Sequence, residues 1–163
     1  MDMRRRDFLG WGVAAMAAPV AGLVPVRALA ARSKLAISPL TGRLSLITGG
    51  AANIVVASAD NELLLVDGGA VADAGQLAKL LASHFPGQRL NAVTNTHWHW
   101  AQSGFNATAR KAGADVLAHE NTRLWLSTEV NSRWEGRVYK PQPAAALPNK
   151  SFYYGPQTLS FGG

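Results

Sequence analysis

Two histidines spaced two residues apart directly follow an apolar run, and this arrangement constrains the chain most. His97 and His99 come after residues 90–94, and a helix-like segment begins just beyond Gly104. Because side chains alternate along an extended segment, both imidazoles project to the same side. They can therefore reach one metal ion at about 2.0–2.1 Å. The sequence predicts a buried strand that carries half of a metal site at its end.

The apolar pattern upstream of the histidines predicts three strands. Residues 43–48 alternate with period two, and residues 52–57 form a second strand. Residues 59–62 have the composition of a hairpin connection. Residues 63–66 are apolar at every position, as expected for a strand buried on both faces. This run stops at Asp67, and two glycines follow.

Further along the chain, the apolar period changes from that of a strand to that of a helix. Residues 74–85 place their apolar side chains on one helical face. Residues 105–112 also predict a helix, and residues 115–118 predict a short strand. Asn121 is the predicted N-cap of a helix over residues 122–128. The pattern predicts an α/β fold in which helices cover at least one face of a sheet.

Residues 130–163 are predicted as a loop followed by edge strands. Residues 131–150 are rich in Pro and Ala and indicate a loop. Residues 151–154 and 158–161 indicate two short strands around a turn. The sequence stops at Gly163 directly after this pattern, so we expect a truncated protein whose C-terminal part is missing.

The first 30 residues have the composition of an export signal. A basic segment precedes an apolar stretch at residues 11–24, and residues 28–30 form a small-x-small cleavage site. The apolar stretch is shorter than the roughly 20 residues of a transmembrane helix. The segment Arg-Arg-Asp-Phe-Leu at residues 5–9 resembles the bacterial twin-arginine signal. We expect residues 31–163 to be periplasmic or secreted; the alternative is an uncleaved signal that anchors the protein to the membrane.

Charge and cysteine content exclude some functions. The formal net charge is +6, and removing residues 1–30 takes away four arginines and two aspartates, which leaves +4. These charges are scattered and form no basic stripe with interleaved aromatic residues, so nucleic-acid binding is not expected. The chain has no cysteine, which excludes disulfides and thiolate ligands. Any metal site must use histidine and carboxylate side chains.

Residues 44–126 resemble the N-terminal half of the metallo-β-lactamase fold. The strand at 63–66 that ends in Asp67-Gly-Gly is similar to the family's strand ending in Asp-x-Gly. The segment Thr-His-Trp-His-Trp-Ala-Gln-Ser-Gly at residues 96–104 lies where the family has T-H-x-H-x-D-H-x-G, and Asn106 extends the match. The resemblance implies a partial domain that forms one αβ half of the family's αββα sandwich.

The resemblance also implies a set of site residues. His97 and His99 would be two ligands of the first zinc ion. Asp67 would lie beneath the metal loop and orient a ligand. From the residues alone, the alternative is that both histidines are ordinary polar loop residues and that Asp67 only holds the loop in place.

Two substitutions separate this sequence from the family's motif. Ala101 and Gln102 stand where the family has the aspartate and histidine that bind a second metal. Alanine has no lone pair to offer and a neutral amide is a poor zinc ligand, so a second metal site is not expected. The family's third histidine of the first site comes well downstream, whereas no histidine follows His119. The sequence therefore implies a weak or partial zinc site.

Other residues near the motif have predicted structural roles. His119 is expected to be structural or exposed, because its spacing does not match a third ligand. Trp98 and Trp100 alternate with the histidines and are expected to face the other way and pack against the fold.

The resemblance implies an exported, zinc-dependent protein of the hydrolase type. Its intact relatives would use zinc-bound hydroxide to attack a small-molecule ester, amide or thioester. The degraded motif and absent downstream ligands argue against full activity in this chain. The alternative is a non-catalytic remnant or binding protein that uses its exposed sheet face. A second copy of the chain or a missing C-terminal half are the expected partners, and a one-zinc enzyme completed by a second chain is a third hypothesis.

Overall fold

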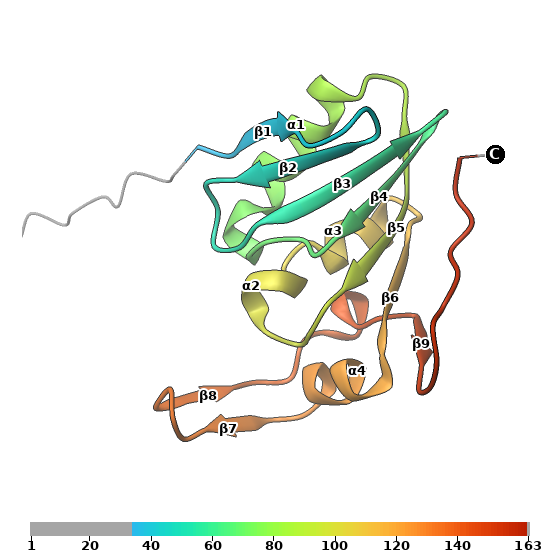
Figure 1. The fold of residues 1–163 in the computed structure, drawn as a ribbon. Coiled ribbons are helices and arrows are strands. Elements are labelled where there is room, and N and C mark those ends of the chain that lie inside the picture. The colour runs from blue at the N-terminus through green and yellow to red at the C-terminus, as the bar shows by residue number, and fades with distance from the viewer. Residues whose placement is uncertain (1–33, 163) are drawn as a thin grey trace, which may run out of the picture. The chain divides into compact units, whose positions relative to one another are not determined.

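A computed structural model describes residues 34–162 (Figure 1), so the predicted export signal at residues 1–30 lies outside the described residues. The described part forms a seven-stranded sheet, a separate two-stranded hairpin and four α-helices. None of the helices in this range is long and apolar enough to cross a membrane. The chain is an α/β protein, as the sequence predicts.

The first four strands form an antiparallel meander. They are β1 (Ala36–Pro39), β2 (Leu44–Thr48), β3 (Ile54–Ala59) and β4 (Glu62–Val66), and each pairs with the next. The predicted hairpin connection between β3 and β4 is confirmed, and Asp60 within it has a φ of +48°. Aspartate tolerates this left-handed conformation better than most residues.

The remaining strands continue the sheet in parallel. β5 (Arg89–Asn95) pairs with β4, β6 (Asp115–His119) pairs with β5, and β9 (Lys150–Phe152) pairs with β6. Because the carboxyl ends of parallel strands meet at one edge of a sheet, the loops after β4 and β5 lie beside each other. The segment after β4 begins at Asp67, and the segment after β5 contains both histidines of the motif.

Helices cover one face of this sheet, as Figure 1 shows for α1 (Ala74–His84) and α3 (Asn106–Lys111). A short 3₁₀ helix, η1 (Val71–Asp73), leads into α1. Leu77 of α1 is fully buried and belongs to the same apolar cluster as Leu63 and Leu65 of β4. The sheet and the helices thus share one core.

The helix predicted over residues 105–112 is confirmed, since α3 lies within this range. A second short helix, α2 (Trp100–Ser103), precedes it and was not predicted. Phe105 lies between them and is buried in the core. The chain turns here because it packs closely against the loop after β4, which a helical periodicity does not reveal.

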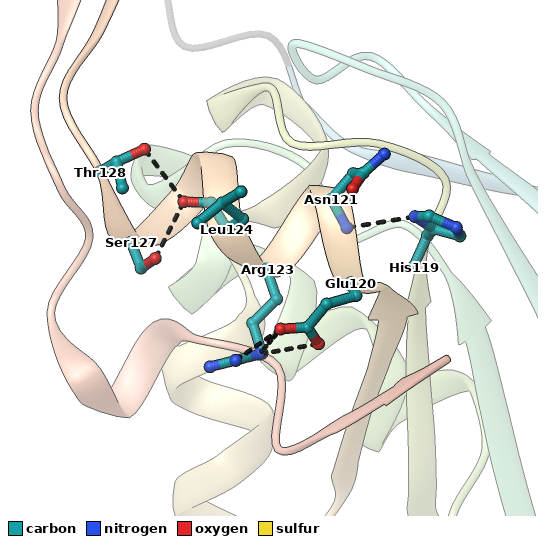
Figure 2. A network of polar contacts seen from close by, with 7 residues as sticks. All are labelled: His119, Glu120, Asn121, Arg123, Leu124, Ser127 and Thr128. Atoms are coloured by element: carbon teal, nitrogen blue, oxygen red, sulfur yellow. Dashed lines mark hydrogen bonds and ion pairs between the residues drawn. The ribbon is translucent and has the colours of Figure 1, made fainter. Parts of the chain in front are cut away.

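Figure 2 shows the start of α4 (Glu120–Ser127), where the predicted cap is wrong. The N-cap residue is His119, whose Nδ1 accepts a hydrogen bond from the backbone N–H of Asn121 at 3.1 Å. Nε2 must then carry the proton and donate to the carbonyl oxygen of Tyr153, 2.9 Å away. These contacts give His119 a structural role.

An ion pair stabilises the first turn of the same helix. Arg123 donates from Nε to both carboxylate oxygens of Glu120, at 2.9 and 3.0 Å (Figure 2). These hydrogen bonds, followed by one from Ser151, lower the pKa of Glu120 to about 2. The charged carboxylate also lies at the helix N-terminus, where negative charge is favourable.

The predicted loop over residues 131–150 contains a hairpin. It consists of β7 (Val130–Ser132) and β8 (Arg137–Tyr139), and a 3₁₀ helix, η2 (Ala144–Ala146), follows. β9 is the edge strand expected near residues 151–154, whereas residues 158–161 form neither helix nor strand. β7 and β8 have three residues each. An alternating apolar pattern cannot be recognised in so short a segment.

Candidate functional site

The loop between β5 and α2 brings the two histidines of the motif together. The ring centroids of His97 and His99 are 4.9 Å apart, and the ring planes meet at 71°. His99 has extended backbone angles and directly precedes α2. Both side chains line one cleft, so the spacing in sequence corresponds to proximity in space. Whether they bind a metal stays a prediction.

Asp67 lies beneath this loop and holds its first residue. Its side chain accepts a 2.8 Å hydrogen bond from the backbone N–H of Thr96 and another of 2.8 Å from the Thr96 hydroxyl. The Thr96 oxygen is also 2.9 Å from Nδ1 of His97. Since the hydroxyl proton goes to the carboxylate, Nδ1 of His97 must be the donor in that contact. The lone pair of His97 is therefore on Nε2.

Backbone contacts join the loops after β4 and β5 closely. The N–H of Gly68 donates to the carbonyl of Gln102 at 2.6 Å, and the N–H of Gly104 donates to the carbonyl of Gly69 at 2.8 Å. A Cβ atom at position 104 would lie 2.1 Å from the backbone nitrogen of Val71. Only glycine fits there, which explains why the motif ends in this residue.

A pair of buried amides joins the two ends of residues 95–106, here called the histidine loop. Asn95 and Asn106 exchange hydrogen bonds of 3.1 and 2.8 Å between their side chains. Asn106 is fully buried and also donates to the carbonyl oxygen of Ala146 at 3.0 Å. The sequence indicated Asn106 only as an extension of the motif, and the role of Asn95 was missed. An Asn directly after an apolar, strand-like run is the signal that could have found it.

The β7–β8 hairpin contributes the other wall of the cleft. This cleft has a volume of about 320 Å³, within the usual range for a small-molecule site. The hairpin residues in it were missed by the sequence analysis, because their segment was predicted to be a loop. The cleft is lined by His97, His99, Trp100, Ala101, Gln102, Glu135, Arg137 and Tyr139.

Glu135 is the acidic side chain of this wall. Its Oε1 lies 3.7 Å from Nε2 of His99. The pKa of Glu135 is lowered first by the Ser132 hydroxyl and then by the Tyr139 hydroxyl and the charges of His99 and Arg137. The Ser132 hydroxyl is buried and makes no hydrogen bond of good geometry within residues 34–162. Glu135 is thus a carboxylate held beside an imidazole.

The aromatic residues around the histidines have two different roles. Trp98 stacks on His99 with ring centroids 4.3 Å apart and also packs against Trp125 at 5.1 Å, which agrees with its predicted packing role. Trp100, however, lines the cleft and meets Tyr139 edge-on at 5.2 Å. The expectation that Trp100 faces away is wrong, because α2 begins at this residue and the alternation of an extended chain ends.

The described residues do not reproduce the two-metal ligand set that the resemblance implies. Within residues 34–162, no three His, Cys, Asp or Glu side chains lie close enough to hold a metal ion as they stand. Ala101 offers no ligand atom. The side-chain oxygen of Gln102 is buried and has no hydrogen-bond partner within residues 34–162. A neutral amide oxygen is nevertheless a poor zinc ligand. Neither position offers a good ligand for a second zinc ion.

Comparison with known proteins identifies a family. The family model for the metallo-beta-lactamase superfamily matches residues 47–150. No curated protein sequence matches the chain. The family match covers β3 to β6 with the loops that hold Asp67 and the histidines.

Solved structures share the fold at low sequence identity. BJP-1, a subclass B3 metallo-beta-lactamase of Bradyrhizobium japonicum, is 17% identical with a TM-score of 0.63, over 80% of this chain and 50% of that one. A Cronobacter sakazakii metallo-beta-lactamase is 15% identical with a TM-score of 0.62, over 81% and 51%. One from Pontibacter korlensis is 15% identical with a TM-score of 0.56, over 79% and 57%. The chain spans about half the length of these structures.

Proposed function

The chain belongs to the metallo-β-lactamase superfamily, whose fold supports a protein of the hydrolase type, and we propose that it is exported and carries a partial zinc site on His97 and His99. The substrate class would be a small-molecule ester, amide or thioester, which the size of the cleft allows. Full activity requires ligands beyond those that the described residues gather.

One observation carries this proposal, namely the orientation of the His97 imidazole. Asp67 fixes Thr96, and Thr96 fixes Nδ1 of His97, so that Nε2 is free to bind a ligand in the cleft. Metal-binding histidines are typically held in this way, through a hydrogen bond at the other ring nitrogen. An ordinary polar loop residue needs no such support.

The test is the zinc content of the purified chain after dialysis against a small excess of zinc. His97→Ala and His99→Ala should each lower the bound zinc sharply, because each removes one imidazole ligand. His84→Ala is the matched control, since His84 lies at the end of α1 away from the cleft. Negligible zinc in the unaltered chain, unchanged by the two variants, would contradict the proposal.

Export is proposed from the sequence of residues 5–9 and is tested separately. A twin-arginine signal depends on its arginine pair, so changing Arg5→Lys and Arg6→Lys together should keep the protein in the cytoplasm. Fractionation of cells that produce the two forms measures this. Unchanged export of the double variant would rule out the twin-arginine route.

A second candidate is a non-catalytic binding protein that uses the sheet face away from α1. Leu64 and Val66 alternate with the buried Leu65, so they point to that face, where both are only half-buried. If the face binds a second copy, Leu64→Glu should shift a dimer to monomer in sedimentation experiments. Val71→Glu is the control, since Val71 is exposed elsewhere. A chain that is monomeric at high concentration would exclude self-association.

A further inference from the structure

We propose that Glu135, in the turn between β7 and β8, completes a three-ligand divalent-metal site with His97 and His99. This inference rests on the proposed function, because it uses the same two histidines. It differs in its third ligand, which comes from the hairpin rather than from the motif or from a downstream histidine. The resulting donor set is two imidazoles and one carboxylate.

The distance between Glu135 and His99 is close to that between two ligands of one metal. Zinc bonds of about 2.0–2.1 Å in tetrahedral geometry separate neighbouring ligand atoms by roughly 3.3–3.4 Å. Oε1 of Glu135 and Nε2 of His99 are 3.7 Å apart. This separation exceeds a hydrogen bond, yet it needs only a few tenths of an ångström of closure to match a shared metal ion.

The other imidazole is available on the same cleft. His97 has its Nδ1 committed to Thr96, so Nε2 is its free nitrogen. His97, His99 and Glu135 all line this one cleft. The three side chains do not converge on one point as they stand, so metal binding must draw the carboxylate inward. Glu135 can move because it lies in a turn at the surface rather than in a strand.

Among the described residues, Glu135 is the glutamate that makes no direct ion pair with a lysine or arginine, although the charge of Arg137 acts on it. Glu62 pairs with Arg89, Glu120 with Arg123, and Glu129 with Lys140. Among the described residues, the ion-pair partner of Glu135 is His99, which is charged only when protonated. A divalent cation bound between the two groups would replace this longer contact with two coordination bonds.

The donor set indicates which metals to test. Two histidines and one glutamate are the ligands of several catalytic zinc sites, with the fourth position left open. The same combination also suits non-haem iron(II). Zinc is therefore the primary probe, and cobalt(II) is a spectroscopic substitute whose visible absorption reports the ligands.

The experiment measures zinc affinity by calorimetry on the metal-free full chain. Glu135→Gln keeps the shape of the side chain but removes its charge. It should weaken zinc binding by about tenfold or more, because even the loss of a residue that only hydrogen-bonds a metal ligand has an effect of this size. Glu129→Gln is the matched control, because Glu129 adjoins the same hairpin but lies outside the cleft. It should leave the affinity unchanged. Glu135→Asp, which keeps a carboxylate, should retain more affinity than Glu135→Gln.

Cobalt(II) absorption gives a second reading that does not depend on activity. Replacing the carboxylate should change the visible bands of the bound cobalt, whereas Glu129→Gln should not. Circular dichroism of each variant confirms that the fold is intact.

The outcomes separate this inference from the proposed function. If Glu135→Gln binds zinc as tightly as the unaltered chain or more tightly, while His97→Ala and His99→Ala lose zinc, the role of Glu135 is overturned and the zinc proposal stands. If the histidine variants also bind zinc normally, both fail. Weakened binding in Glu135→Gln together with the histidine variants supports both.

Discussion

The two walls of the cleft are built in different ways. The histidine loop is held by buried carboxylate, amide and backbone contacts, and Asp67, Asn95 and Asn106 are all among the buried residues. The β7–β8 hairpin lines the cleft with the buried Tyr139 and with Glu135 and Arg137, while its turn is exposed. A rigid wall that presents imidazoles thus faces a wall whose turn can adjust. The difference predicts that substitutions in the histidine loop cost far more stability than those in the hairpin turn.

The largest effect is expected for Gly104→Ala. The added methyl group would lie 2.1 Å from the Val71 nitrogen and 2.2 Å from the Ala70 carbonyl carbon, both of which are backbone atoms that cannot move aside. The free energy of unfolding should fall by about 3 kcal/mol or more, as for severe overpacking. Urea denaturation measures this. Gly75→Ala in α1 is the control, because its Cβ meets nothing within 4 Å.

Asn106→Ala should have the next largest effect. It removes the partner of Asn95 and leaves the carbonyl of Ala146 without its hydrogen bond. Unpaired buried polar groups should lower the free energy of unfolding by about 2–3 kcal/mol. The exposed Asn53 provides the control substitution, Asn53→Ala. Equal urea midpoints for the two variants would mean that the amide pair does not stabilise the loop.

A smaller effect is expected for Asp67→Asn. Asparagine tolerates the positive φ of +65° at this position, so the backbone conformation can be kept. The amide has one acceptor oxygen, so one of the two hydrogen bonds to Thr96 is lost and the other has a neutral acceptor, which should cost about 1–2 kcal/mol. Nitrogen NMR of His97 should show a proton on Nδ1 in the unaltered chain and a mixture of tautomers in the variant. An unchanged tautomer would show that Asp67 does not orient His97.

The smallest effect is expected in the hairpin. Trp134 is 77% exposed in the turn, so Trp134→Ala should change the free energy of unfolding by no more than about 0.5 kcal/mol. Tyr139→Ala is the contrasting substitution, since Tyr139 is 5% exposed and meets Trp98 and Trp100. If Trp134→Ala were as destabilising as Asn106→Ala, the two walls would not differ in the way described.

The wall of the cleft that carries the histidines could be predicted, because its sequence patterns involve residues close together in the chain. The run that became β4, the turn at Asp67 and the pair His97 and His99 were all recognisable, because short-range periodicity and a motif carry them. What failed depends on contacts between distant segments. The short helix α2 was not predicted, and the turn between α2 and α3 follows from packing of residue 104 against the loop after β4, which no helical pattern encodes.

The other wall of the cleft could not be predicted for a related reason. β7 and β8 have three residues each, too few to show an alternating pattern. Glu135 is an acidic residue in a polar segment, and only the fold brings it 3.7 Å from His99. His119 likewise has an unremarkable position in the sequence, and its capping contact with Asn121 was assigned to the wrong residue.

The hydrogen bonds that hold the histidine loop do not use the side chains of two of its residues, Ala101 and Gln102. Gln102 supports the loop through its main-chain carbonyl, and Ala101 contributes only a methyl group to the cleft. The backbone conformation of the loop therefore does not depend on which side chains occupy those two positions. Ala101→Asp with Gln102→His would install new ligand atoms in an existing frame, so the chain offers a starting point for protein engineers who wish to add a metal centre without redesigning a backbone.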